Sequence, residues 1–248
     1  MDLGLSGKRA AVAASSAGLG FGAAAALVAE GAQVAICGRD EERVADAARR
    51  LGGAAIPLVV DVGTTDGATQ FVELATERLG GVDILVANAG GPPAGTFAST
   101  SLEAYRPALE LSLLSVVAMC QAAVPSMQAA GWGRIVAITS MFVRQPSPTM
   151  ILSNTARSGV TAFLKTLARE VAGHGITVNS VQPGAHATDR MRSLYGGDLS
   201  GAAASIPAGV LGDAADFGAV VAFLCSEQAR FVTGTHVPVD GGAYAGLL

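Results

Sequence analysis

The 248-residue sequence predicts an α/β fold, a single domain built on a doubly wound parallel sheet with helices on both faces. Three observations predict it. Half of the residues are hydrophobic, short apolar runs alternate with helix-like segments from the N-terminus onward, and no linker rich in proline, serine or charge interrupts the chain. Strands joined through helices imply right-handed crossovers, which place the strands parallel in one sheet.

The alternation can be followed along the chain. An apolar run at 9–14 and a Ser/Gly turn precede an Ala-rich helix at 21–30, and the same succession then repeats. The later predicted elements are strands at 33–37, 55–60, 84–87, 134–139 and 177–181 and helices at 41–51, 69–79, 102–130 and 153–172. The irregular segment 189–208 follows the carboxyl end of a strand, where α/β folds bind ligands, and is interpreted as a substrate lid. A surface loop without a role is the alternative.

Charge and composition narrow the class of partner. The chain has 16 basic and 20 acidic residues and no long basic run, so a nucleic acid or an anionic membrane has no electrostatic support, and a small-molecule ligand is expected. No apolar run approaches the roughly 18 residues of a membrane span, and the N-terminus does not resemble a signal peptide. Cys37, Cys120 and Cys225 lie far apart in apolar segments, which indicates buried thiols, no metal site and a cytoplasmic protein.

A glycine-containing turn follows the first predicted strand. Its sequence is Ala13-Ala14-Ser15-Ser16-Ala17-Gly18-Leu19-Gly20. Gly18 and Gly20 would let the backbone approach a pyrophosphate at the N-terminus of the next helix. Ala14 implies either that the first turn position does not need a positive φ or that the turn is remodelled.

The end of the second predicted strand bears on which dinucleotide could bind. It reads Cys37-Gly38-Arg39-Asp40, with no acidic side chain at position 38 to accept hydrogen bonds from the ribose of NAD. The guanidinium of Arg39 could pair with a 2′-phosphate, so NADP is favoured over NAD. The alternative is that Arg39 only solvates or caps the following helix.

Further motifs resemble the short-chain dehydrogenase/reductase family, in particular its members of the 3-oxoacyl-acyl-carrier-protein reductase type. They are Asp61-Val62, Asn88-Ala89-Gly90, Pro183-Gly184 with Thr188, and Val239-Asp240-Gly241-Gly242, and with the glycine turn they span residues 7–243 in the family's order. The resemblance implies a Rossmann-like fold and these cofactor-binding residues: Ser15, Ser16, Gly18, Leu19, Gly20, Arg39, Asp61, Val62, Asn88, Ala89, Gly90, Arg157, Pro183, Gly184 and Thr188.

The same alignment departs from the family at its catalytic residues. Ser140 matches the family's serine, but Ser153 and Arg157 stand where its Tyr-x-x-x-Lys pair is expected, and Ser112 stands where asparagine is usual. The resemblance implies that Ser140 and Ser153 hold the substrate oxygen, that Arg157 orients the nicotinamide ribose and stabilises charge, and that Ser112 supports a water molecule. An alcohol is a far weaker acid than a phenol, so Ser153 cannot simply replace tyrosine.

Other side chains could then supply the proton or bind the substrate. His186 in the nicotinamide loop titrates near neutrality, and Tyr195 belongs to the predicted lid. For both, a solvent-facing loop position is the alternative. Arg144 could bind a carboxylate or phosphate of the substrate or lie on the surface. His174 and His236 are interpreted as structural.

The sequence therefore predicts an atypical NAD(P)(H)-dependent oxidoreductase that acts on a small carbonyl or alcohol. A dinucleotide- or metabolite-binding protein without redox activity is the first alternative, and a lyase or isomerase is the second. By the family resemblance, a homotetramer or homodimer would form through the long helices at 102–130 and 153–172.

Overall fold

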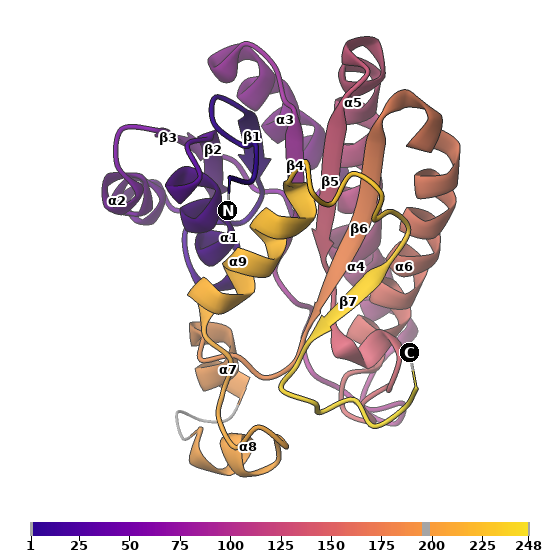
Figure 1. The fold of residues 1–248 in the computed structure, drawn as a ribbon. Helices are drawn as coiled ribbons and strands as arrows, with labels where there is room; N and C mark the ends of the chain where they lie inside the picture. Colours follow the sequence, from indigo (N-terminus) through magenta and orange to yellow (C-terminus); the bar gives the residue numbers. More distant parts are fainter. Residues whose placement is uncertain (1, 195–198, 248) are drawn as a thin grey trace.

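A seven-stranded parallel sheet forms the centre of the computed structural model, which describes residues 2–194 and 199–247 (Figure 1). Its strand order is β3-β2-β1-β4-β5-β6-β7. The strands are β1 (Arg9–Val12), β2 (Gln33–Gly38), β3 (Ala55–Val59), β4 (Ile84–Ala87), β5 (Gly133–Ile138), β6 (Ile176–Pro183) and β7 (His236–Val239). The chain moves outward from β1 to β3 and then returns to place β4 on the other side of β1, which confirms the predicted doubly wound α/β fold.

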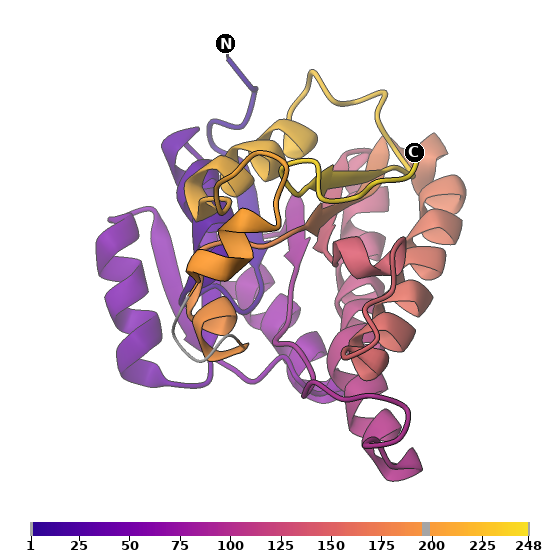
Figure 2. The ribbon, with the colours of Figure 1, turned by 90° about the horizontal axis from the view of Figure 1, so that it is seen from below.

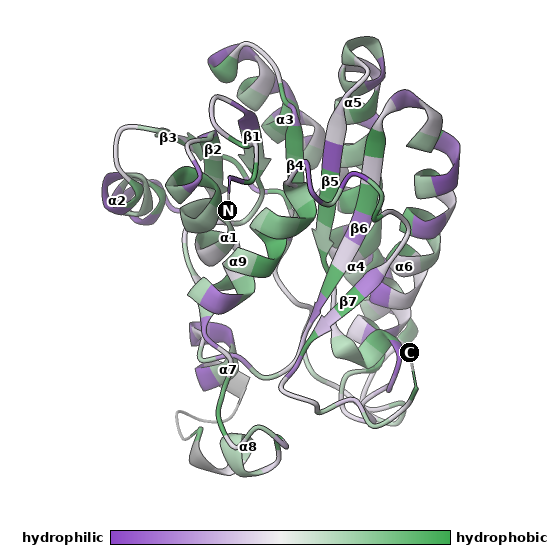
Figure 3. Ribbon diagram, viewed as in Figure 1, coloured by the Kyte–Doolittle hydropathy of each residue, from purple (hydrophilic) through white to green (hydrophobic). Residues whose placement is uncertain are grey.

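Helices cover both faces of this sheet. One face carries α1 (Gly18–Ala29), α2 (Glu41–Leu51) and α9 (Ala214–Cys225), and the other carries α3 (Thr65–Leu79), α5 (Ser115–Ala130) and α6 (Ile151–Val171). The shorter pieces are η1 (Leu102–Ala104), α4 (Tyr105–Leu109), the π-helical turn η2 (Glu110–Leu114), η3 (Met141–Val143), η4 (Ala172–His174), α7 (Asp189–Leu194) and α8 (Ser200–Ala204). Each face encloses its own apolar cluster, and Figure 3 shows β4 and α9 as mostly hydrophobic.

Several elements differ from the sequence prediction. The strand β7 and the helix α9 were not predicted, because β7 is short and contains proline, and because α9 is apolar nearly all round and shows no amphipathic stripe. The predicted helix at 102–130 is divided by η2. The predicted lid holds the short helices α7 and α8, which lie at the lower end of Figure 1.

One helical stretch, Leu102–Ala130, is long and apolar enough to cross a membrane by length and composition. This corrects the expectation that no segment approaches a span. Its most apolar window is 44% buried within the protein, and a core helix satisfies the same criteria. The stretch includes α5, which packs against α3 and the sheet.

The helices α1 and α9 pack so closely that each needs a glycine. A Cβ on Gly22 would overlap the carbonyl oxygen of Ala214, and a Cβ on Gly218 would overlap the carbonyl oxygen of Gly22. Backbone therefore lies directly on backbone where the two helices cross. Because α1 begins at the glycine turn, this contact also fixes the position of that turn at the carboxyl edge of the sheet.

We predict that Gly218→Ala lowers the free energy of unfolding by about 1–3 kcal/mol, because the new methyl group must push α1 away from α9. The midpoint of urea denaturation measures the change. Gly173→Ala is the matched control: its added Cβ has no neighbour within 4 Å, so stability should stay constant or rise slightly. Equal midpoints for wild type and Gly218→Ala would contradict the close-packing argument.

Candidate functional site

The carboxyl ends of the strands bring four of the sequence motifs together, at the edge seen in Figure 2. The glycine turn meets the loop after β6, since a Cβ on Gly18 would lie 3.6 Å from Cγ2 of Thr188. The loop after β4 meets the same turn through Asn88. Helix α6 meets the end of β5 through Arg157, whose Nη1 donates to the carbonyl of Ile138 at 2.9 Å.

Ala14 begins the glycine turn in a strained conformation. Its φ is +46°, and among the described residues it is the one non-glycine residue with a positive φ. The interpretation that this position does not need a positive φ is therefore wrong. An L-residue in the left-handed region costs roughly 1–2 kcal/mol, so other contacts must hold the turn.

Two predicted cofactor-binding side chains supply those contacts. Nδ2 of Asn88 donates to the carbonyls of Ala13 and Ala14, at 3.3 and 3.2 Å. Oγ of the buried Ser15 donates to the carbonyl of Val12 at 2.6 Å and accepts from the amide of Cys37 at 3.2 Å. In this structure the side chains of Asn88 and Ser15 therefore hold the backbone of the turn in place.

The third glycine position of the turn has no room for a side chain. A Cβ on Gly20 would lie 2.6 Å from the carbonyl oxygen of Ala14 and 2.9 Å from Nδ2 of Asn88. The start of α1 therefore packs directly on the turn and on the loop after β4. Leu19 and Ala89 are partly exposed beside it, and Gly90 is exposed.

The residues expected near an adenosine group lie at the ends of β2 and β3. A Cβ on Gly38 would lie 3.0 Å from Oγ of Ser16, so the space for an acidic side chain at position 38 is restricted. The side chain of Arg39 is 79% exposed, and its Nη1 is 3.9 Å from Oδ2 of Asp61. Such an exposed, long ion pair holds the guanidinium weakly. Val62, next to Asp61, is buried in the core.

The two predicted catalytic serines lie on different elements, one in the loop after β5 and the other in α6. Ser140 follows β5, and its Oγ accepts a hydrogen bond from the amide of Phe142 at 3.1 Å, which caps η3. Ser153 lies in the first turn of α6 and is 5% exposed. Arg157 follows Ser153 by one helical turn, so both project from the same face of α6.

Arg157 carries its charge in a poorly solvated place. Burial, and after it the positive charge of Arg190, lower the pKa of its guanidinium to about 10. The group stays cationic at neutral pH. Its bond to the carbonyl of Ile138 aims the charge at the carboxyl edge, where it can bind an anion or stabilise developing negative charge.

Ser112 lies in the π-helical turn η2 and is 2% exposed. Its Oγ is buried and has no hydrogen-bond partner among the described residues. This turn packs against α6, because Leu113 lies 3.2 Å from the position of a Cβ on Gly159. An unpaired buried hydroxyl is costly unless a water molecule or ligand satisfies it, and the role of Ser112 stays a prediction.

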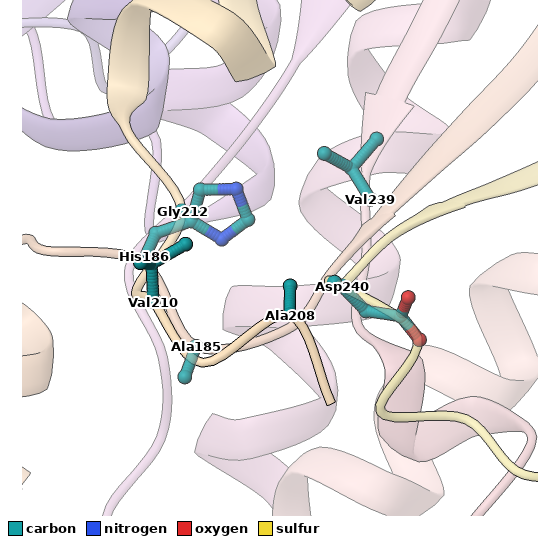
Figure 4. Close-up of a pocket in the computed structure, with 8 residues that line it drawn as sticks. Ala185, His186, Ala208, Val210, Gly212, Val239 and Asp240 are labelled. Carbon is teal, nitrogen blue, oxygen red and sulfur yellow. The ribbon is translucent and has the colours of Figure 1, made fainter. Parts of the chain in front are cut away.

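The loop after β6 contains His186, which lines a cavity of about 80 Å³ with Ala185, Ala208, Val210, Gly212, Val239, Asp240 and Gly241 (Figure 4). Nδ1 of His186 lies 3.1 Å from the carbonyl of Gly184, so Nδ1 carries the proton. The ring is 3% exposed, meets Phe217 edge to face, and burial lowers its pKa. These contacts suit a neutral packing histidine, and its role as proton donor stays a prediction.

The same loop is anchored to the last strand. Pro183 is in register with Val239, and the amide of Gly184 donates to the carbonyl of Val239 at 2.9 Å. Further on, Thr188 accepts a hydrogen bond from the amide of Met191 at 3.3 Å and so begins α7. The loop that faces Gly18 is thus fixed at both ends.

Arg144 points to the β6–β7 side of the sheet. Its Nε donates to Oε1 of Gln182 and its Nη2 to the carbonyl of His236, both at 2.8 Å, and it stacks over Tyr244. His236 in turn contacts Ser180 through Nδ1 at 2.8 Å. These bonds occupy Arg144 within the protein.

Tyr195, the other predicted proton donor, lies outside the described residues. His174 belongs to η4, at the amino end of β6 and away from the carboxyl edge.

The three cysteines are buried and free, and burial raises the pKa of each thiol to about 12. They are therefore poor nucleophiles.

Arg190 is a site residue that the sequence did not single out. It lies in α7, and its Nη2 donates to the carbonyl of Pro92 at 2.8 Å. Its positive charge also contributes to the lowered pKa of Arg157. Its position two residues after Thr188 is the one signal that could have found it.

Comparisons with known proteins find similar sequences and a similar fold. The family profile described as "Enoyl-(Acyl carrier protein) reductase" matches residues 13–244. The chain is 35% identical over 240 residues to the 3-oxoacyl-[acyl-carrier-protein] reductase FabG of Haemophilus influenzae, covering 97% of this chain and 99% of that protein. It is 32% identical to human dehydrogenase/reductase SDR family member 4, covering 96% and 88%. The structure of L-sorbose reductase from Gluconobacter frateurii, complexed with NADPH and L-sorbose, superposes with a TM-score of 0.92 at 32% identity over 100% of both chains.

We predict that Ala14→Gly raises the free energy of unfolding by about 0.5–1 kcal/mol, because glycine adopts a positive φ without strain. Thermal denaturation should show a rise of about 1–4 °C. Ala25→Gly, within α1, is the control and should lower stability by about 1 kcal/mol. A loss of stability in Ala14→Gly as large as in the control would show that Ala14 is not strained.

Proposed function

The chain belongs to the short-chain dehydrogenase/reductase family, and from this premise we propose that it is an NADP(H)-dependent oxidoreductase acting on a small carbonyl or alcohol with an atypical proton donor. The observation that carries the proposal is the contact between the glycine turn and the loop after β6, at Gly18 and Thr188. It supports a single binding edge for the pyrophosphate and the nicotinamide of one dinucleotide.

The residues present fit such a cofactor. Gly18 and Gly20 keep the turn free of side chains at the start of α1, where backbone amides and the helix dipole favour phosphate. The rest of the site would be lined by Ser16, Leu19, Asp61, Ala89, Gly90, Pro183, Gly184 and Thr188. Ser15 and Asn88 support the turn, and the buried Val62 supports the site from the core. When bound, NADP(H) would supply or accept the hydride.

The choice of NADP over NAD follows from the ends of β2 and β3. Gly38 offers no carboxylate, and Ser16 restricts the space for one. Arg39 is held weakly by Asp61 and can exchange that partner for a 2′-phosphate. The NADPH complex of the similar sorbose reductase supports the same preference.

The chain's own residues would hold the substrate and stabilise charge. Ser140 and Ser153 donate hydrogen bonds to the substrate oxygen, and Arg157 stabilises negative charge as it develops on that oxygen. Arg157 cannot serve as a proton shuttle at neutral pH, because its pKa is about 10. Ser112 would hold a water molecule that delivers a proton to the substrate oxygen as the hydride reaches the carbonyl carbon. General acid catalysis contributes about 10² to 10⁴-fold, so a reductase without the tyrosine is slower, not inactive.

A protein that binds the dinucleotide without redox turnover is the second candidate. The weak acidity of Ser153 favours it, since no phenol stands at that place on α6. Binding of NADPH without oxidation across a broad carbonyl panel would support this reading. The retained Pro183, Gly184 and Thr188 favour redox use of the nicotinamide, and they also argue against a lyase or isomerase.

We also propose that the protein works in the reducing cytoplasm, where its three free cysteines persist as thiols. Exposed apolar side chains, among them Leu114 at the end of η2, support assembly into a homotetramer or homodimer through the long helices.

We predict that Arg39→Ala raises the Kd for NADPH by about tenfold or more and leaves the Kd for NADH unchanged, since only NADPH offers a phosphate to the guanidinium. Titration followed by nicotinamide fluorescence measures both constants. Arg49→Ala on α2, another exposed arginine beside an aspartate, is the control. Equal weakening of both dinucleotides would contradict the assignment, and no binding of either by the wild type would overturn the proposed function.

We predict that Ser140→Ala lowers kcat by at least about tenfold with any carbonyl that the wild type reduces, while NADPH affinity is retained. The lost hydroxyl contacts the substrate oxygen and no phosphate. Steady-state kinetics and cofactor titration separate the two effects, and Ser158→Ala, exposed on α6, is the control. An unchanged kcat would remove Ser140 from the mechanism.

A further inference from the structure

Ser140 and Arg144 lie at the two ends of one short turn, η3, which follows β5. Oγ of Ser140 caps its beginning by accepting a hydrogen bond from the amide of Phe142 at 3.1 Å. Arg144 closes its end, where the backbone amide donates to the carbonyl of Met141 at 3.0 Å. A single 3₁₀ turn has few hydrogen bonds of its own, so its position depends on what holds its two ends.

The side chain of Arg144 ties the far end of this turn to the sheet. Its Nε donates to Oε1 of Gln182 on β6, and its Nη2 donates to the carbonyl of His236 on β7, both at 2.8 Å. The two donors lie on one edge of a planar group, so bonds to two neighbouring strands fix both its position and its orientation. The guanidinium carbon also lies 5.7 Å from the ring centre of Tyr244.

The partner of Arg144 on β6 is an amide in the interior of the protein. Gln182 is fully buried, and its Nε2 has no hydrogen-bond partner among the described residues. Arginine has no acceptor atom, so the amide oxygen of Gln182 must face it. A buried amide costs free energy that an apolar side chain would not. Within the described residues the bond to Arg144 is the one hydrogen bond of this side chain, which indicates that its task is to anchor the arginine.

We propose that Arg144 is a positioning residue, which acts through η3 to keep the hydroxyl of Ser140 directed at the substrate oxygen. The bond from Phe142 uses a lone pair of Oγ, so the hydroxyl hydrogen stays free to donate to that oxygen. A donor to a reacting oxygen is effective only when it is held within a fraction of an ångström of its place. The inference rests on the proposed function for the role of Ser140.

The same contacts argue against a direct role for Arg144 in substrate binding. A substrate anion that took the Nε and Nη2 edge would break both bonds to the sheet. It would also leave the whole amide of Gln182 buried without a partner. The arginine that the sequence suggested as a substrate ligand therefore acts on the substrate through the serine.

A double-mutant cycle on kcat tests this coupling. Arg144→Met should lower kcat about three- to tenfold with any carbonyl that the wild type reduces, and should change KM and the Kd for NADPH less than about twofold. In the Ser140→Ala background the same change should lower kcat less than about twofold, because the hydroxyl that it positions is gone. Arg144→Lys retains one donor and should lie between. Gln145→Met is the control, since this neighbouring side chain is exposed and makes no hydrogen bond within the described residues.

Two further measurements do not depend on a single variant or on turnover. Gln182→Met keeps the volume of the buried side chain and removes the acceptor, so it should lower kcat about two- to threefold when Ser140 is present and not when Ser140 is alanine. Amide hydrogen exchange of residues 140–145, followed by mass spectrometry, should become about tenfold faster in Arg144→Met and stay unchanged in Gln145→Met.

Two results would overturn the proposal. One is that Arg144→Met changes kcat by the same factor with and without the hydroxyl of Ser140, or leaves it unchanged in both, since the arginine would then not act through the serine. The other is unchanged hydrogen exchange at 140–145 in Arg144→Met, since the turn would then not depend on this anchor. A wild type that binds NADPH and reduces no carbonyl would sink the redox function alone, and the exchange measurement would still decide this inference.

Discussion

The amide of Asn88 bonds to two consecutive carbonyl groups, those of Ala13 and Ala14, and the rest of the site depends on this pair of hydrogen bonds. They hold a turn whose first residue is in a left-handed conformation without being glycine. Because β4 is the strand that follows the reversal of direction in the sheet, Asn88 joins the two halves of the fold at their switch point. The close approach of Gly20 to the same atoms then sets where α1 begins.

The period of the hydrophobic pattern was enough to predict most of the fold. Helix α2 and strand β4 begin and end where the sequence placed them, since each has a strong pattern and clear end signals. The pattern failed where burial is nearly uniform, as in α9, or where tertiary contacts reshape a helix, as in η2. The hydrophobic period alone does not identify a π-helical turn, because such a turn is defined by its backbone hydrogen bonds from residue i to i+5.

The sequence predicted less of the candidate site than of the fold, because motifs do not show in which direction a side chain points. Motifs place residues at the carboxyl edge, but they do not say whether a side chain faces the ligand or supports the backbone. Ser15 and Arg144 both use their polar atoms inside the protein. Arg190 is the reverse case: it belongs to no motif, and only the folded chain brings it to Pro92. Side-chain direction depends on long-range contacts that a single sequence does not encode locally.

The crossing of α1 and α9 has a consequence for how the protein is made. Gly22 and Gly218 touch, so the first helix of the chain packs directly on α9, which forms late in the sequence. On the ribosome, β1 to β6 would be synthesised before α9, so the surface of α1 that α9 covers would stay exposed during that time. Contacts between such distant residues form slowly, because a long loop must close before they are made. The final stage of synthesis is therefore the period in which this protein most needs protection from aggregation.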